Sequence, residues 1–129
     1  MDIIPINIES FVDIIEVKLP NEDLFNFDES HSNYYAKSGL TKAIAQTQNY
    51  IFELENKTKD KEYQEKNSCK IIRPRGIVLF GSNRELNEEE TKYLRILNSS
   101  YHNIKIMTYQ QLLDRAQNTI RLITEFSIE

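Results

Sequence analysis

Two mostly apolar runs at the start of the chain predict a β-hairpin. Residues 1–7 and 11–19 are rich in isoleucine and valine, which favour strands, and turn-forming residues separate the two runs. A hairpin centred near Glu9 places Asp2 opposite Glu16 or the neighbour of Glu16, within reach across an antiparallel pair. We therefore expect two acidic residues to meet near this hairpin.

The pattern then changes to helical spacing. Residues 24–32 predict an irregular loop, and from about residue 34 to residue 55 apolar side chains recur three and four positions apart, as in one long helix. Ser38 or Thr41 is a candidate for the helix start. The expected inner face consists of Leu40, Ala43, Ile44, Thr47, Ile51 and Leu54. Residues 56–70 are strongly polar and predict a surface loop or a frayed helix end.

The second half of the chain alternates strand and helix patterns. The apolar run 76–81 predicts a central strand that is covered on both faces, and residues 104–107 predict a further strand. Asn87, followed three positions later by Glu90, predicts the start of a helix that ends near Ser99. The side chains expected to point inward from this helix are Tyr93, Leu94 and Leu97.

A last helix is predicted after residue 107. Thr108 and Gln111 repeat the spacing of a helix-capping box. The residues expected to be buried are Leu112, Leu113, Ala116, Ile120 and Ile123. A hairpin followed by crossover helices gives the order β-β-α-β-α-β-α, so we predict an α/β fold with a mixed β-sheet flanked by α-helices.

Length and composition favour a cytoplasmic domain without a membrane partner. The 129 residues suffice for one domain with its own core. Apolar runs stay well short of the roughly 18 residues of a membrane span, and Asp2 and Pro5 interrupt a signal-peptide pattern. The single cysteine, Cys69, excludes an internal disulfide and fits a reducing compartment. We interpret Cys69 as a bystander, because no histidine lies near it in sequence.

The net charge of −4 argues against a domain that binds nucleic acid by overall charge alone. It does not exclude a metal-dependent nuclease, whose active site is itself acidic before Mg²⁺ binds. Affinity for DNA would then come from a local basic patch, an oligomer or further parts of the protein. Lys70, Arg73 and Arg75 form one basic cluster in sequence, which is a candidate contact for phosphates or simply a solvated start of a strand.

Glu16 and Lys18 are the candidate catalytic pair. Alternate residues of a strand share a face, so these two side chains lie together, whereas Asp13 points away from Glu16. A carboxylate and an ammonium on an otherwise apolar strand are costly to bury without a partner or a metal. The alternative is an ordinary ion pair at the end of a strand, since the tripeptide pattern is common.

The combination of Asp2, the run Glu16-Val17-Lys18, and Gln46 with Tyr50 resembles the PD-(D/E)xK nuclease superfamily. Several segments resemble, more narrowly, the nuclease domain of Shedu anti-phage defence proteins; they are residues 12–20, 43–50, 76–81 and 108–113. The resemblance implies a restriction-endonuclease-like core in one domain, residues 1–129. It also implies that this domain is the C-terminal part of a longer protein whose first core helix precedes residue 1.

The resemblance further implies a metal-dependent DNA endonuclease that acts in bacterial defence and forms a homo-oligomer. Asp2 and Glu16 would hold Mg²⁺, for which Mn²⁺ can substitute, with the backbone carbonyl of Val17 as a further ligand. Lys18 would orient or deprotonate the attacking water or stabilise the transition state. Gln46 would position the water or the lysine. Tyr50 would pack against the site or contact the backbone of the nucleic acid.

Two other classes of function compete with this interpretation. One is a nuclease-fold module without catalysis that serves nucleic-acid binding or oligomerisation. The other is an α/β enzyme acting on a small molecule, which the sequence disfavours because it contains three glycines in all and no glycine-rich phosphate loop. His31 and His102 fall in expected loops without ligand-like spacing, so a zinc site is not expected.

Overall fold

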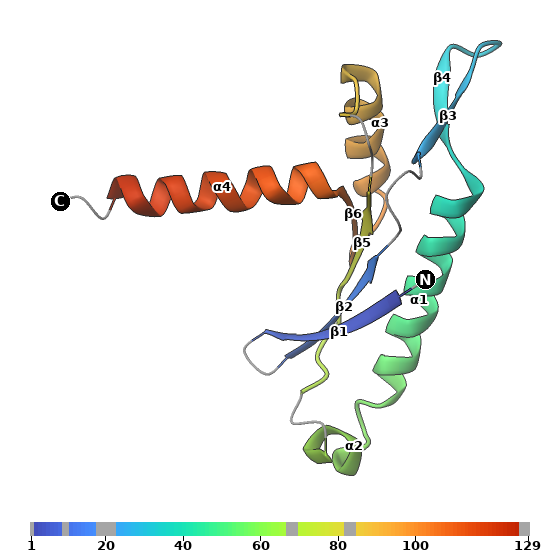
Figure 1. Ribbon diagram of the computed structural model, residues 1–129. Coiled ribbons are helices and arrows are strands. Elements are labelled where there is room, and N and C mark those ends of the chain that lie inside the picture. The colour runs from blue at the N-terminus through green and yellow to red at the C-terminus, as the bar shows by residue number, and fades with distance from the viewer. Residues whose placement is uncertain (1, 9–10, 18–22, 67–69, 82–84, 127–129) are drawn as a thin grey trace.

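The computed structural model describes residues 2–8, 11–17, 23–66, 70–81 and 85–126, with the backbone alone described for residues 2–8, 11 and 12 (Figure 1). The elements in chain order are β1 (Asp2–Ile8), β2 (Phe11–Val17), β3 (Phe25–Asp28), β4 (Asn33–Ala36), α1 (Ser38–Asn56), α2 (Lys61–Lys66), β5 (Gly76–Phe80), α3 (Glu88–Asn98), β6 (Ile104–Thr108) and α4 (Tyr109–Phe126).

The main sheet is mixed, as the order of elements predicts. Its strands lie in the order β1-β2-β5-β6, with β1 antiparallel to β2 and the other neighbours parallel. Parallel neighbours require crossover connections, and these contain α1 and α2 between β2 and β5, and α3 between β5 and β6. The predicted central position of β5 and the α/β class are therefore confirmed.

Helix α1 packs against one face of this sheet. Leu40, Ala43, Ile44, Thr47 and Ile51 are buried, which confirms the predicted inner face of the helix. Gly76 at the start of β5 lies at the closest approach, because a Cβ atom at this position would overlap Cγ2 of Thr47. The absence of a side chain at Gly76 thus lets α1 approach the sheet closely.

The segment before α1 forms a hairpin rather than the predicted loop. Strands β3 and β4 pair antiparallel, so the predicted onset of helical structure near residue 34 was wrong by about one turn, whereas the candidate start at Ser38 is confirmed. Phe25 is buried and its ring contacts the rings of Tyr34 and Tyr93, whereas Phe27 is exposed. Phe25 and Phe27 are two residues apart and share one face of β3, where both rings contact that of Tyr34; this face is buried at Phe25 and opens to solvent at Phe27.

Helix α2 lies within the stretch predicted to be a polar loop or a frayed helix end. It is only six residues long and buries no residue, so the predicted exposure of this stretch is confirmed for its described part. Tyr63 is half-buried and packs on Ile71, which forms a small apolar cluster apart from the main core.

Both predicted helix starts in the second half are confirmed. The side chain of Asn87 accepts from the backbone of Glu90, whose carboxylate accepts from the backbone of Asn87, and the pair caps α3. The backbone of Thr108 donates to the Gln111 side chain at 3.1 Å, and the backbone of Gln111 donates to Thr108 Oγ1 at the same distance. Local sequence therefore set both helix starts.

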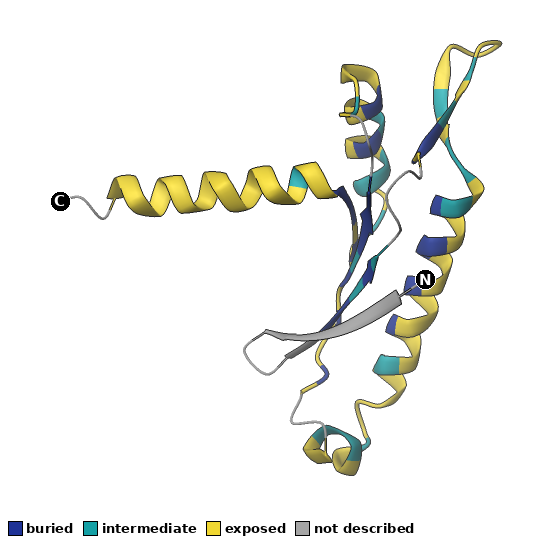
Figure 2. Cartoon of the chain, viewed as in Figure 1, coloured by how far each residue is buried: buried dark blue, intermediate teal, exposed yellow. Residues whose placement is uncertain are grey.

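The predicted burial of α4 was wrong. Helix α4 leaves the sheet after β6 and extends away from the other elements, and it is exposed along nearly all of its length (Figure 2). Ile120 and Ile123 expose 64% and 61% of their surface. The apolar pattern of α4 specifies a face of the helix but does not specify what covers that face. Within the described part of the chain, no helix combines the length and the apolar character that a bilayer span requires.

Candidate functional site

Glu16 is the central residue of the candidate site. It lies on β2, an inner strand of the sheet, and its side chain is completely buried beneath α1. Thr47 of α1 is equally buried, and its hydroxyl donates to Oε2 of Glu16 at 2.6 Å. The same hydroxyl lies 2.8 Å from the carbonyl oxygen of Ala43, one helical turn earlier. A hydroxyl has one hydrogen, so Thr47 donates to either the carboxylate or the helix at any moment.

Asp13 lies on the opposite face of the same strand, as its position in sequence predicts. Its Oδ1 accepts from the backbone N–H of Arg75 at 2.9 Å, and its Oδ2 pairs with the guanidinium of Arg75 at 3.1 Å. Strand alternation therefore separates the two acids of β2, with Glu16 facing α1 and Asp13 facing Arg75.

The register of the β1–β2 hairpin shows which residues of the two strands lie opposite Asp2 and Glu16. Asp2 pairs with Val17, and Ile3 pairs with Glu16, so the expected pairing with Glu16 or its neighbour is met at the neighbour. Directly paired residues share a face of the sheet, so this register places position 2 on the face opposite that of Glu16. The side chain of Asp2 and the whole of Lys18 lie outside the described residues. Val17 is half-buried and pairs with Leu79 of β5. Within the side chains that are described, no group of three acidic, histidine or cysteine residues could hold a metal ion. The roles of Asp2, Lys18 and Val17 stay predictions.

Gln46 and Tyr50 lie on the solvent side of α1. Both are exposed, with Tyr50 retaining 44% of its surface, and the side chain of Gln46 makes no hydrogen bond to a described residue. The residue of α1 that donates a hydrogen bond to Glu16 is Thr47, the next position along the chain. The sequence contained a signal for this contact, because Thr47 was the one polar member of the predicted inner face, and a buried hydroxyl requires a hydrogen-bond partner.

One residue of the predicted basic cluster is engaged by a carboxylate. Lys70 and Arg73 are exposed and make no ion pair with a described residue, whereas Arg75 pairs with Asp13. Arg73 adopts a left-handed backbone conformation with φ of 45°, two residues before Arg75. The interaction of Arg75 with β2 was not predicted, because it joins residues 62 positions apart in the sequence.

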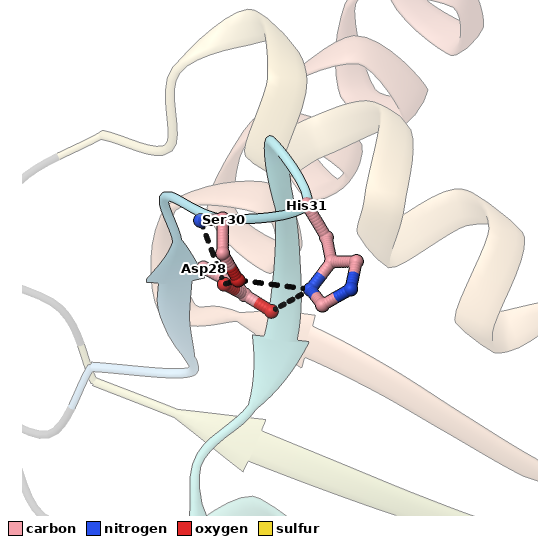
Figure 3. A network of polar contacts seen from close by, with 3 residues as sticks. All are labelled: Asp28, Ser30 and His31. Atoms are coloured by element: carbon pink, nitrogen blue, oxygen red, sulfur yellow. Dashed lines mark hydrogen bonds and ion pairs between the residues drawn. The ribbon is translucent and has the colours of Figure 1, made fainter.

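A polar cluster at the tip of the β3–β4 hairpin superficially resembles a catalytic triad (Figure 3). Ser30 donates from its hydroxyl to Asp28 Oδ1 at 2.6 Å, and Nδ1 of His31 lies 3.0 Å from the Ser30 hydroxyl and 2.8 Å from Asp28 Oδ2. The pKa of the Asp28 carboxyl is below its usual value, mainly because of the hydrogen bond from the Ser30 hydroxyl and next because of the hydrogen bond with His31.

This cluster stabilises the turn and is not built for acyl transfer. In a triad the serine meets one ring nitrogen and the carboxylate meets the other. Here the same nitrogen of His31 meets both, and the Asp28 carboxylate also accepts from the backbone of Ser30 at 3.0 Å. Side-chain acceptance from a backbone N–H two residues on is the geometry of an Asx turn.

Comparison with known proteins adds one finding. Residues 1–113 match the model of the family described as Shedu protein SduA, C-terminal. The match runs from β1 into the first turn of α4, so it includes all candidate site residues. None of the curated proteins compared with the chain matches it.

Proposed function

This chain belongs to the family of the Shedu protein SduA C-terminal region, and on that basis we propose that it is a metal-dependent DNA endonuclease of the PD-(D/E)xK superfamily. Membership of the family supports a role in the Shedu anti-phage defence system. The nuclease activity, the metal and the DNA substrate are the proposal. A mixed sheet with crossover helices, with Glu16 on an inner strand, supports it.

The observation that carries the proposal is the complete burial of the Glu16 carboxylate. Burying an ionised carboxylate in a protein interior is costly unless polar groups or a cation compensate it. A site that only needed to fold would be served as well by an apolar residue on this strand. Thr47 holds one oxygen of the carboxylate in a defined orientation, and ligands of catalytic metals are oriented in this way by neighbouring hydrogen-bond donors.

The metal that we propose is a magnesium ion held by Glu16, Asp2 and the carbonyl of Val17, since Mg²⁺ prefers oxygen donors. Asp2 would reach this ion from the edge strand β1, whose register places position 2 on the face opposite Glu16. When bound, the metal would lower the pKa of a water and draw charge from the phosphate. Lys18 would orient that water or stabilise the developing negative charge. Gln46 would assist from α1, on whose exposed side it lies.

The second candidate function is that of an oligomerising module without catalysis. Helix α4 favours an oligomer whether or not the chain is a nuclease. Its apolar stripe consists of Leu112, Leu113, Ala116, Ile120, Ile123 and Phe126. The large residues of this stripe expose between 41% and 79% of their surface. An apolar stripe along an 18-residue helix is expensive to leave in water. We propose that a second copy of the chain covers it, since two identical amphipathic helices bury each other's stripes in one symmetric contact.

The test is cleavage of supercoiled and linear DNA with Mg²⁺, with Mn²⁺ and with EDTA. Variants Glu16→Gln and Lys18→Ala should abolish cleavage, whereas the control Glu53→Gln removes an exposed carboxylate of α1 and should cleave as the unchanged chain does. Metal-dependent cleavage that survives in either site variant would overturn the assignment of the site. A folded protein that cuts neither DNA with any metal would leave the oligomerising module as the function.

A further inference from the structure

A groove with a volume of about 940 Å³ runs beside the edge strand β6. Its walls are the sheet, the C-terminal part of α3 and the first turns of α4; α3 leads into β6 and α4 leaves from it (Figure 1). Four cationic side chains line the groove, from four separate parts of the chain: Arg75, Arg95, Lys105 and Arg115. These four residues are far apart in the sequence, so a local sequence pattern does not predict that they lie in one groove.

The groove carries more positive than negative charge, although the whole chain has a net charge of −4. Two carboxylates share the lining, Asp13 and Asp114. Asp13 is matched by Arg75 at 3.1 Å, and Asp114 accepts from the amide of Gln110 at 2.9 Å. The three remaining cations, which we call the groove cations, are Arg95, Lys105 and Arg115.

None of the groove cations forms an ion pair with a described residue, and all three are exposed. The pKa of Lys105 is lowered mainly by the partial burial of its ammonium group and, to a smaller extent, by the positive charge of Arg115. Lys105 and Arg115 are therefore close enough to repel each other. Like charges brought together without an anion are unfavourable by themselves and favour a ligand that supplies negative charge.

The groove is separate from the Glu16 site. In the parallel register Ile15 pairs with Ile77 and Ile77 pairs with Lys105, so Lys105 belongs to the face of β2 that carries Asp13. Glu16 belongs to the other face, beneath α1. A ligand in the groove would contact the protein beside the sheet edge without reaching the buried carboxylate.

We propose that this groove binds the sugar–phosphate backbone of DNA, with Arg95, Lys105 and Arg115 as phosphate contacts. Guanidinium groups match the geometry of phosphate oxygens, and a groove of about 940 Å³ that receives cations from three different elements suits a chain of phosphates better than one compact anion. The inference rests on the proposed function, because it takes DNA as the substrate. It gives an acidic protein the local basic patch that DNA affinity requires.

The experiment measures the binding of a fluorescent DNA duplex by anisotropy in EDTA, where a metal-dependent nuclease cannot cut. The test variant combines Arg95→Gln, Lys105→Gln and Arg115→Gln. The matched control combines Lys42→Gln, Lys59→Gln and Lys61→Gln, which remove the same charge from exposed positions outside the groove. Thermal unfolding followed by circular dichroism verifies that both variants fold.

The test variant should raise the dissociation constant at least tenfold at low salt, and the control should change it by less than about threefold. The slope of log affinity against log salt should decrease in magnitude by about 2 to 3 in the test variant, because about three phosphate contacts are lost. Equal weakening of DNA binding in both variants, or no DNA binding by the unchanged chain, would overturn the proposal that the groove binds DNA. Failure of the test variant to fold would move the measurement to the single Arg115→Gln change, with a slope change of about 1 expected.

The outcomes also separate the groove from the nuclease. Binding that depends on the groove cations, in a protein that never cuts DNA, would support the groove and reject the nuclease. Cleavage that requires Glu16, with unchanged DNA affinity and KM in the test variant, would support the nuclease and reject the groove. The Glu16→Gln variant should bind the duplex as the unchanged chain does, since Glu16 lies on the other face.

Discussion

The hydroxyl of Thr47 on α1 donates to Oε2 of Glu16 on β2 across 2.6 Å, and both side chains are completely buried. The bond joins the helix to the sheet and orients the one carboxylate of β2 that faces α1. Since Thr47 has no exposed surface, its only role toward a substrate is through Glu16. This makes Thr47 a positioning residue whose effect on stability and on activity can be separated.

Thr47→Val should lower the free energy of unfolding by about 1–3 kcal/mol, because it preserves the shape of the side chain and removes the hydrogen bond to a buried carboxylate. If Glu16 holds a metal, cleavage should fall by about 10- to 100-fold. Thr47→Ser keeps the hydroxyl and should restore most of the activity. Urea unfolding and the cleavage assay measure the two effects, and a fully active Thr47→Val variant would contradict the positioning role.

Gly76→Ala should destabilise the chain by about 1–3 kcal/mol, because the new methyl group overlaps Cγ2 of Thr47 and lies 3.3 Å from Cδ1 of Ile51. Combining it with Thr47→Ser, which lacks Cγ2, should make the cost of Gly76→Ala smaller. Urea unfolding of the two single variants and the double variant gives the coupling. If the changes in unfolding free energy are additive, the steric conflict with the new methyl group comes from α1 as a whole and not from Cγ2 of Thr47 alone.

Ile120→Glu should reduce the mass of the particle in solution, because it places a charge in the centre of the apolar stripe of α4. Asn118→Glu adds the same charge on the polar side of α4 and should leave the mass unchanged. Light scattering after size exclusion, at several protein concentrations, measures both. A chain that is monomeric without any substitution would contradict the symmetric contact proposed for α4.

Asp28 should titrate below its ordinary value of 3.8, because the Ser30 hydroxyl and then His31 favour the charged carboxylate. A group whose pKa is lower in the folded state contributes stability above its unfolded pKa and loses that contribution as the pH falls through the folded pKa. The unchanged chain should therefore be more stable than Asp28→Asn at neutral pH, and the two free energies of unfolding should become equal only below about pH 4. A carbon-detected NMR titration of the carboxyl gives the pKa directly, and a midpoint at or above 3.8 would contradict the network.

Features that depend on neighbouring residues were predictable from the sequence. The two capping boxes, the apolar strand β5 and the inner face of α1 each follow from residues a few positions apart. The hairpin of β3 and β4 was missed because four-residue strands give little periodic signal. The burial of α4 was mispredicted because an apolar stripe does not identify what covers it.

The candidate site was predictable to a lesser degree, since its contacts join distant segments. Strand alternation separated Glu16 from Asp13 correctly, and the register of β1 met the expectation by pairing Asp2 with Val17, the neighbour of Glu16. Gln46 was expected to position the attacking water or Lys18, which stays a prediction, whereas the hydrogen bond from Thr47 of α1 to Glu16 was not predicted. The groove cations come from α3, β6 and α4, so only the folded chain brings them together.

The bonds between Asp13 and Arg75 have a consequence for how the protein tolerates insertions and deletions. Asp13 accepts twice from Arg75, and the carbonyl of Arg75 accepts from the backbone of Ile14 at 2.9 Å, which fixes β5 against β2 at one register. A slip of one residue would exchange the two faces of β2, turning Glu16 outward and Asp13 inward. Natural variation in this strand should therefore preserve its length more strictly than the identity of its apolar residues.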